Sequence, residues 1–279
     1  MFTVTNRQHT LQRELEYVAF SIQNERENNE DSFLVTTLLP RPGHSPLTVL
    51  AVADGMGGHA HGEDISREAL RKLGLALCEQ LIIAPSINEP NETRAINVEN
   101  LETILLDAVD QVNLYVRSMV ERNHWIKAGS TIVAAIITQD QVIAMNVGDS
   151  PLYHFTDSLR QLTKVTEDHT VAGALLRAGM ITPRMAQVHE GNHQLEFYLG
   201  GQHLPRQRAL HRLQLAQDDL LLLCSDGISS ALTEVQIEAI LANSNRDLES
   251  KAEELISCAS NSGSTDNQTL ILMRHNSYL

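Results

Sequence analysis

The stretch TVLAVADGMGGHAHGED, residues 48–64, decides the fold and raises the question of function. Its apolar run from Val49 to Ala53 has the composition of a buried strand and stops at Asp54. Four glycines and two histidines follow, namely Gly55, Gly57, Gly58, Gly62, His59 and His61. Glycine lets a backbone turn tightly or approach another group closely. The pattern therefore predicts a core strand that ends in a carboxylate and a glycine-rich turn.

The excess of acidic residues limits the kinds of partner that we expect the protein to bind. Asp and Glu number 35 against 21 Lys and Arg, which gives a formal charge of −14 over 279 residues. Such a surface repels nucleic acid and anionic membranes, so we expect neither as a partner. The same surface is compatible with divalent cations. The length and the 42% apolar content fit a globular chain with a sizeable core.

Three isolated cysteines indicate a reducing compartment. Cys78, Cys224 and Cys258 form no C-x-x-C pair, so we expect free thiols rather than disulfides or a zinc site. The N-terminal residues contain no apolar signal core, and no apolar run approaches the roughly 18 residues that a membrane helix needs. These features predict a cytoplasmic protein.

Strand-like runs are grouped along the chain rather than alternating with helices. We predict strands at 17–22, 32–37, 48–53, 130–138, 141–147, 151–155, 219–225 and 268–274. Apolar residues at helical spacing predict helices at 64–83, 99–122, 233–242 and 247–260. The grouping favours the α+β class over a doubly wound parallel sheet, with the first two long helices packed together on one sheet face.

Carboxylates recur at the ends of the predicted strands. LLLLCSDG carries Asp226 after an apolar strand, and MNVGDS carries Asp149 at another strand end. GSTDNQT places Asp266 directly before a strand, and Glu30 and Asp31 stand before the second predicted strand. A single Asp-Gly pair is usually only a turn, so the interpretation depends on the whole set. Converging carboxylates are costly without a cation, and hard oxygen ligands suit Mg²⁺ or Mn²⁺ better than zinc.

An ordered series of short motifs resembles a known family. RENNED, VADGMGGHAHGE, AGST, NVGDS, TEDHT, LLCSDGI and STDNQT follow one another along the chain. The series resembles the metal-dependent protein phosphatases, the type 2C serine/threonine phosphatases, over about residues 16–274. The resemblance implies a four-layer αββα sandwich in which helix pairs flank two antiparallel sheets. It also implies one catalytic domain over 1–279. The broken periodicity and the scattered Gly and His residues near 170–195 predict a mobile flap beside the cleft.

The resemblance also assigns metal-binding roles. It implies two Mn²⁺ or Mg²⁺ ions bridged by Asp54, with the Gly55 carbonyl as another ligand. Asp226 and Asp266 would complete the shell of the first ion, so Asp54, Asp226 and Asp266 form the expected catalytic set. The remaining ligands would be Glu30 and Asp31 beside the second ion and Asp149 at a third, weaker site. The ions would activate a water to attack the phosphorus of phosphoserine or phosphothreonine.

Arg26 is the expected contact to the substrate phosphate. It stands four residues before Glu30, at the spacing of the family's phosphate-binding arginine. A guanidinium fork matches two phosphoryl oxygens. The alternative is that Arg26 pairs with Glu25, Glu27 or Glu30 at the surface.

Two positions depart from the family pattern. Met56 stands where many relatives have a histidine proposed as the general acid, and His59 and His61 nearby are either solvated or catalytic. Pro151 stands where relatives often have an arginine, which removes a contact to flap or substrate and leaves the metal set intact.

Three functions compete on this basis. The leading hypothesis is an active phosphatase that acts as a monomer on phosphorylated proteins. The second is a pseudophosphatase that binds phosphoproteins as a regulatory module; it is disfavoured because Asp54, Asp226 and Asp266 are all present. The third is a hydrolase of small phosphoesters at the same site.

Overall fold

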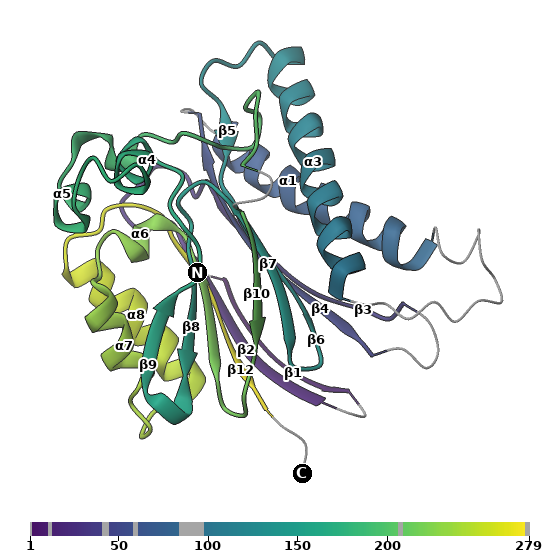
Figure 1. Ribbon diagram of the computed structural model, residues 1–279, viewed down its shortest axis with the longest axis vertical. Helices are drawn as coiled ribbons and strands as arrows, with labels where there is room; N and C mark the ends of the chain where they lie inside the picture. Colours follow the sequence, from purple (N-terminus) through teal and green to yellow (C-terminus); the bar gives the residue numbers. More distant parts are fainter. Residues whose placement is uncertain are drawn as a thin grey trace.

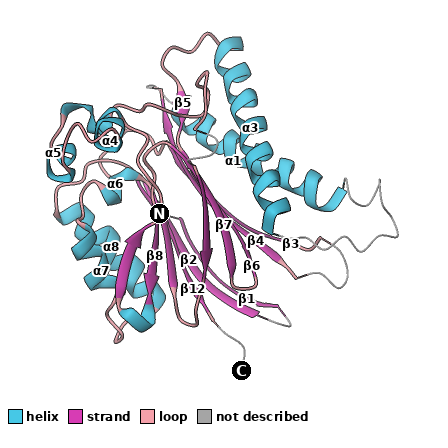
Figure 2. Ribbon diagram, in the orientation of Figure 1, coloured by secondary structure: helices cyan, strands magenta, loops and turns pink. Residues whose placement is uncertain are grey.

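Two antiparallel sheets pack face to face, and helices cover their outer faces (Figure 1). The computed structural model describes residues 2–10, 13–40, 45–57, 61–83, 98–205 and 209–276. Every pairing among the described strands is antiparallel. The strands gather in the centre and the helices outside them (Figure 2), which confirms the expected αββα sandwich of the α+β class.

Each sheet combines strands from distant parts of the chain. The first has the order β1-β2-β12-β11-β8-β9, formed by Phe2–Thr10, Arg13–Ile22, Gln268–His275, Leu220–Cys224, Leu152–Thr156 and Gln161–Lys164. The second has the order β10-β7-β6-β4-β3, formed by Leu210–Gln214, Gln141–Val147, Ile132–Thr138, Leu47–Met56 and Asp31–Leu38. A short strand, β5 (Gly129–Ser130), pairs with the end of β4.

Two groups of helices close the outer layers. α1 (His61–Cys78), which continues into the π-helical turn η1 (Glu79–Ile83), packs with α3 (Val98–Arg122) on the second sheet. α7 (Glu234–Leu241) and α8 (Leu248–Asn261) cover the first sheet (Figure 1). Their N-termini are capped by Thr233, in a capping box with Gln236, and by Asp247.

Strand β4 is buried on both faces. Leu50 and Val52 contribute to the core between the sheets, whereas Val49 and Ala51 contribute to the core beneath α1 and α3. Each of these side chains is fully buried. A strand covered on both faces needs apolar residues at every position, which explains the continuous run in the sequence.

Short helices connect β9 to β10 and surround one end of the sheets. They are α4 (Val171–Arg177), α5 (Pro183–Gln187) and the 3₁₀ turn η3 (Glu190–His193). Thr170 and Thr182 cap the first two by accepting the N–H groups of Gly173 and Met185. Two further turns are the 3₁₀ turn η2 (Asp157–Leu159) and α6 (Asp226–Ser229).

Several predicted boundaries need correction. The strand predicted to stop before Asp54 continues to Met56, because Gly55 and Met56 pair with Ser130 and Gly129 of β5. The run predicted as one strand over 130–138 divides at Thr131 between β5 and β6. Strands β1, β9 and β10 were not predicted, since they are rich in polar residues and lie at sheet edges.

Two further observations bear on the expected environment. None of the helices within the described residues combines the length and apolarity required to cross a bilayer. The three cysteines are free, and Cys224 is buried in the core beneath α7 and α8.

Candidate active site

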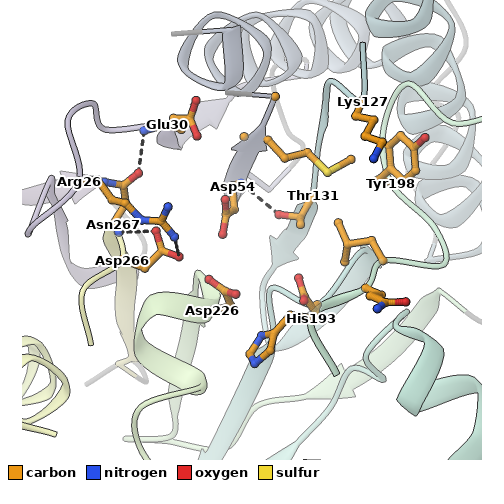
Figure 3. Close-up of a pocket in the computed structure, with 16 residues that line it drawn as sticks. Arg26, Glu30, Asp54, Lys127, Thr131, His193, Tyr198, Asp226, Asp266 and Asn267 are labelled. Carbon is orange, nitrogen blue, oxygen red and sulfur yellow. Dashed lines mark hydrogen bonds and ion pairs between the residues drawn. The ribbon is translucent and has the colours of Figure 1, made fainter. Parts of the chain in front are cut away.

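An acidic pocket of about 700 Å³ opens where strand ends from both sheets meet. Its walls carry five of the predicted carboxylates, Glu30, Asp54, Asp149, Asp226 and Asp266 (Figure 3). These residues come from five separate segments of the chain, so the fold brings together residues that are far apart in the sequence.

Asp54 is positioned by the register of β4. Its N–H donates to the Thr131 hydroxyl at 3.0 Å, and its carbonyl accepts the Thr131 N–H at 2.8 Å. The Thr131 hydroxyl in turn hydrogen-bonds the Ser150 hydroxyl at 2.7 Å. The Asp54 side chain points into the pocket toward Asp226 (Figure 3). The backbone carrying this carboxylate is therefore fixed on both sides.

Gly55 is required by the close approach of two other segments. A Cβ at this position would lie 2.1 Å from the Gly62 carbonyl oxygen and 2.8 Å from that of Glu30. The Gly55 N–H donates to the Glu30 carbonyl oxygen at 3.0 Å. The Glu30 carboxylate accepts the N–H of Gly62 in the first turn of α1, where the helix dipole favours negative charge. Glu30 and Gly55 therefore form one unit at the rim of the pocket.

Asp226 and Asp266 form the opposite wall. Asp226 begins α6 directly after β11, and a Cβ on the next residue, Gly227, would lie 1.9 Å from the Asn267 carbonyl oxygen. One carboxylate oxygen of Asp266 accepts the N–H of Asn267 at 2.8 Å. The close approach at Gly227 keeps the loop bearing Asp266 against α6.

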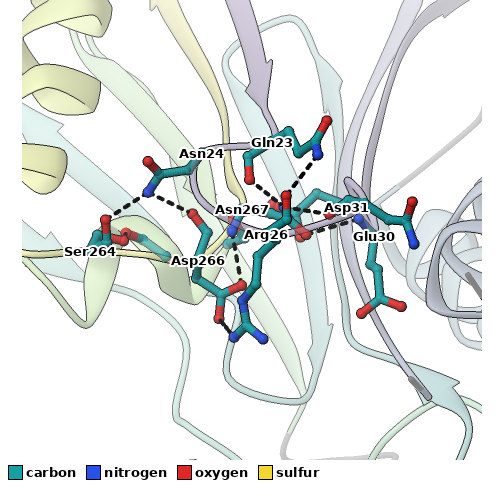
Figure 4. A network of polar contacts seen from close by, with 11 residues as sticks. Gln23, Asn24, Arg26, Glu30, Asp31, Ser264, Asp266 and Asn267 are labelled. Atoms are coloured by element: carbon teal, nitrogen blue, oxygen red, sulfur yellow. Dashed lines mark hydrogen bonds and ion pairs between the residues drawn. The ribbon is translucent and has the colours of Figure 1, made fainter. Parts of the chain in front are cut away.

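Arg26 lies beside these carboxylates rather than beside its sequence neighbours. Its Nη2 donates to the second carboxylate oxygen of Asp266 at 2.6 Å (Figure 4). The loop that carries it is held by Gln23, whose side chain donates to the carbonyls of Arg26 and Glu27, both at 2.7 Å. Asn267 donates to the Gln23 carbonyl at 2.8 Å. The described ion pair is thus with Asp266, and not with Glu25, Glu27 or Glu30.

Asp31 lies outside the pocket wall. It pairs in register with Asp54, but its carboxylate is buried between the sheets and accepts the Ser225 hydroxyl at 2.7 Å. Burial is the main cause that raises the pKa of Asp31 to about 7. Its role as a metal ligand remains a prediction.

The pocket carboxylates destabilise one another's charged forms. Burial, followed by repulsion from Asp31 and Asp226, raises the pKa of Asp54 well above its ordinary value. Burial and repulsion from Asp226 raise the pKa of Asp149 to about 8. Burial and repulsion from Asp266 raise the pKa of Asp226. A divalent cation would remove this penalty, and oxygen-rich ligands suit Mg²⁺ or Mn²⁺.

The carboxylate oxygens therefore suit such ions, although they do not yet form a closed coordination shell. Within the described part of the chain, no three acidic, histidine or cysteine side chains are already gathered as a closed metal site. An open arrangement leaves room for substrate and water beside the carboxylates.

The two positions that depart from the family pattern, and the two histidines of the glycine-rich turn, do not all lie at the pocket. Met56 lines the pocket. Pro151 lies away from the pocket wall, where its carbonyl accepts the Cys224 N–H at 3.2 Å. The His61 ring stacks on Trp125 with centroids 4.4 Å apart and is likewise outside the wall. His59 lies outside the described residues.

Sequence reasoning missed part of the wall. Lys127, His193 and Tyr198 also line the pocket (Figure 3). His193 ends η3, so the segment expected to be a flap does border the cleft. The motif AGST marked the chain beside Lys127, but no sequence pattern placed Tyr198 there.

Comparison with known proteins agrees with this geometry. A family model described as Protein phosphatase 2C matches residues 22–270. The serine/threonine phosphatase stp of Listeria innocua is 36% identical over 233 residues, which cover 82% of this chain and 84% of that protein.

Solved structures show the same fold. The Mycobacterium tuberculosis serine/threonine phosphatase PstP/Ppp superposes with a TM-score of 0.74 at 28% identity, covering 94% of this chain and 99% of that one. A structure of the PstP catalytic domain in complex with 2 manganese ions gives a TM-score of 0.71 at 28% identity, covering 94% and 98%. The chain therefore belongs to the protein phosphatase 2C family and is a metal-dependent protein serine/threonine phosphatase.

Proposed function

We propose that the acidic pocket holds two Mg²⁺ or Mn²⁺ ions and hydrolyses phosphoserine and phosphothreonine in protein substrates there. The observation that carries the proposal is the set of carboxylates from five chain segments that line one pocket. In three of them, Asp54, Asp149 and Asp226, burial and repulsion from neighbouring carboxylates raise the pKa. The two manganese ions in the similar PstP structure support the number of ions.

In this proposal each ligand would have a distinct role. Asp54 would be a shared ligand, and the Gly55 carbonyl would be a further ligand. Asp226 and Asp266 would hold the first ion, Glu30 and Asp31 would hold the second directly or through water, and Asp149 with Asp226 would hold a weaker third ion. When bound, the ions supply positive charge and lower the pKa of a shared water.

Arg26 is proposed to bind the phosphoryl group. Its guanidinium pairs with a single oxygen of Asp266, its side chain is 56% exposed, and it lines the pocket. Engagement of Asp266 with a cation would free the guanidinium to meet two phosphoryl oxygens. The Gln23 and Asn267 hydrogen bonds hold its backbone in place for that contact.

The segment 170–195 is proposed as a flap on a single catalytic domain spanning 1–279. His193, Gln194 and Leu195 at its end line the pocket, so movement of this segment would change access to it. Hydrogen exchange as slow here as in β11 would contradict the proposal.

The proposal also covers the oligomeric state of the enzyme and its compartment in the cell. We propose that the enzyme acts as a monomer, and that it acts in the cytoplasm, which three free thiols support. Size-exclusion chromatography tests the first point. A stable dimer would contradict it.

The decisive test is phosphopeptide turnover in EDTA and after addition of Mn²⁺ or Mg²⁺, with a small phosphoester as comparison. We expect no turnover in EDTA and recovery with either ion. Full turnover in EDTA with no retained metal would contradict the metal centre. Phosphopeptide binding without turnover would favour the regulatory module, and turnover of the small ester alone would favour the small-molecule hydrolase.

A further inference from the structure

The wall of the pocket across from Arg26 carries a second cation. Lys127 and Tyr198 both line this part of the pocket, while Arg26 and Asp266 lie on the far side (Figure 3). Within the described residues Lys127 has no ion-pair partner, in contrast to Arg26 with Asp266. An exposed ammonium group is therefore available at one end of an otherwise acidic pocket.

The backbone at Lys127 is held in an uncommon conformation. Its φ is +55°, in the left-handed region that non-glycine residues seldom adopt. Such a conformation persists where the surroundings impose it, and it is concentrated at binding sites. The next residue, Ala128, is buried and approaches Gly57 so closely that a Cβ on Gly57 would lie 3.0 Å from that of Ala128. Packing thus dictates where the Lys127 side chain leaves the backbone.

Tyr198 is held in place by the short strand β5, which follows Lys127 and Ala128. Ser130 of β5 exchanges hydrogen bonds with Leu199, at 3.2 Å and 2.8 Å. A Cβ on Gly129 would lie 2.6 Å from the Tyr198 ring and 3.0 Å from the end of Met56. The short strand β5 therefore packs against Met56 and Tyr198 and directly follows the segment of Lys127. Its own position is set by its pairing with the two residues of β4 that follow Asp54.

We propose that Lys127 and Tyr198 form a subsite for an acidic side chain that neighbours the phosphorylated serine or threonine of a protein substrate. The inference rests on the proposed function, since the phosphoryl group occupies the Asp54 and Arg26 side of the pocket. An ammonium and a phenol hydroxyl both donate hydrogen bonds to a carboxylate, and Met56 offers an apolar surface beside them. The pocket volume of about 700 Å³ leaves room for more than a phosphoryl group.

The test compares two phosphopeptides that differ only in Asp or Asn beside the phosphorylated residue, with the neighbouring positions tried in turn. At the best position the wild-type enzyme should prefer Asp in kcat/KM by about two- to fivefold, as expected for a partly exposed ion pair. Lys127→Gln should abolish the preference, and Lys127→Arg should keep it. The preference should also fall as salt concentration rises.

Further variants separate this role from folding. Lys127→Gly removes the charge in a residue that accepts the left-handed backbone, and it should behave as Lys127→Gln. Lys72→Gln, on α1 and away from the pocket wall, is the matched control and should keep the wild-type preference. Tyr198→Phe should reduce the preference.

The outcomes distinguish this inference from the proposed function. Phosphopeptide turnover with no Asp preference, or with the same preference in Lys127→Gln, would overturn the subsite and leave the metal centre standing. An unchanged preference in Tyr198→Phe would overturn the part assigned to Tyr198. No turnover of any phosphopeptide by the wild-type enzyme would overturn both proposals.

Discussion

Replacing Asp54 by Asn should separate stability from activity. The substitution keeps the shape of the side chain and removes one negative charge, while the backbone hydrogen bonds to Thr131 remain. Asp54 is buried among like charges, and these raise its pKa. Two carboxylates about 4 Å apart repel by about 4 kcal/mol at the effective dielectric of a protein surface, and partial protonation offsets much of this. We therefore expect the metal-free variant to be about 1–3 kcal/mol more stable than the wild type.

The assay measures two quantities on the same preparations. In EDTA the Tm of Asp54→Asn should exceed that of the wild type by about 2–10 °C. Addition of Mn²⁺ should raise the Tm of the wild type and raise that of the variant much less. Turnover of phosphopeptide should fall more than about a hundredfold, because a bridging ligand is lost.

A surface substitution provides the comparison. Asp64→Asn removes an exposed carboxylate on α1 that pairs with Arg67, so it should change neither quantity appreciably. Near-normal turnover of Asp54→Asn, together with wild-type stabilisation by Mn²⁺, would refute the reasoning that Asp54 is the bridging ligand.

Three further substitutions test separate parts of the account. Arg26→Ala should lower kcat/KM for phosphopeptide about ten- to a hundredfold with little change in Mn²⁺ affinity, and steady-state kinetics showing no loss would assign phosphate binding elsewhere. Gly227→Ala should destabilise the protein by about 1–3 kcal/mol or more in denaturant unfolding. As the control, Gly74→Ala on α1, where a Cβ would lie in ordinary contact 3.7 Å from the Leu34 side chain, should stabilise it slightly. In EDTA the Tm of Asp149→Asn should exceed that of the wild type by a margin that grows from about pH 4 to about pH 8. In the wild type the folded carboxyl keeps its proton up to a pKa of about 8, whereas the unfolded one loses it near 3.8. The stability of the wild type therefore falls between these two pH values, and that of the variant does not. A constant difference would contradict the raised pKa.

The acidic side of the pocket was predictable because the local sequence dictates it. An apolar run that stops at a carboxylate and glycine describes both Asp54 near the end of β4 and Asp226 just after β11. Both strands are buried on both faces, so their ends lie where the layers meet. Both strand ends can therefore be predicted from the local sequence, without knowing which strands pair with β4 and β11.

Features that depend on register could not be predicted. Asp31 precedes the predicted strand 32–37 as a pocket residue would, yet it is the first residue of β3 and its carboxylate is buried against Ser225. Which face a strand residue occupies changes with a shift of one position, and only the pairing with β4 fixes it. The extension of β4 to Met56 likewise follows from the two-residue partner β5.

The second wall depends on contacts between distant segments. Lys127 and Tyr198 are 71 positions apart, and Ser130 and Leu199 bring their segments together. The left-handed backbone at Lys127 is imposed by this packing rather than by its residue type, since lysine has no preference for that region. The sequence motif AGST marked the region without indicating its neighbours.

The most direct test of the central claim is the anomalous scattering of manganese in crystals of the protein grown with Mn²⁺. The account predicts two strong peaks in the pocket, with Asp54 contacting both and with Asp226 and Asp266 contacting one of them. Full manganese peaks elsewhere on the protein, with none beside Asp54, would contradict the account.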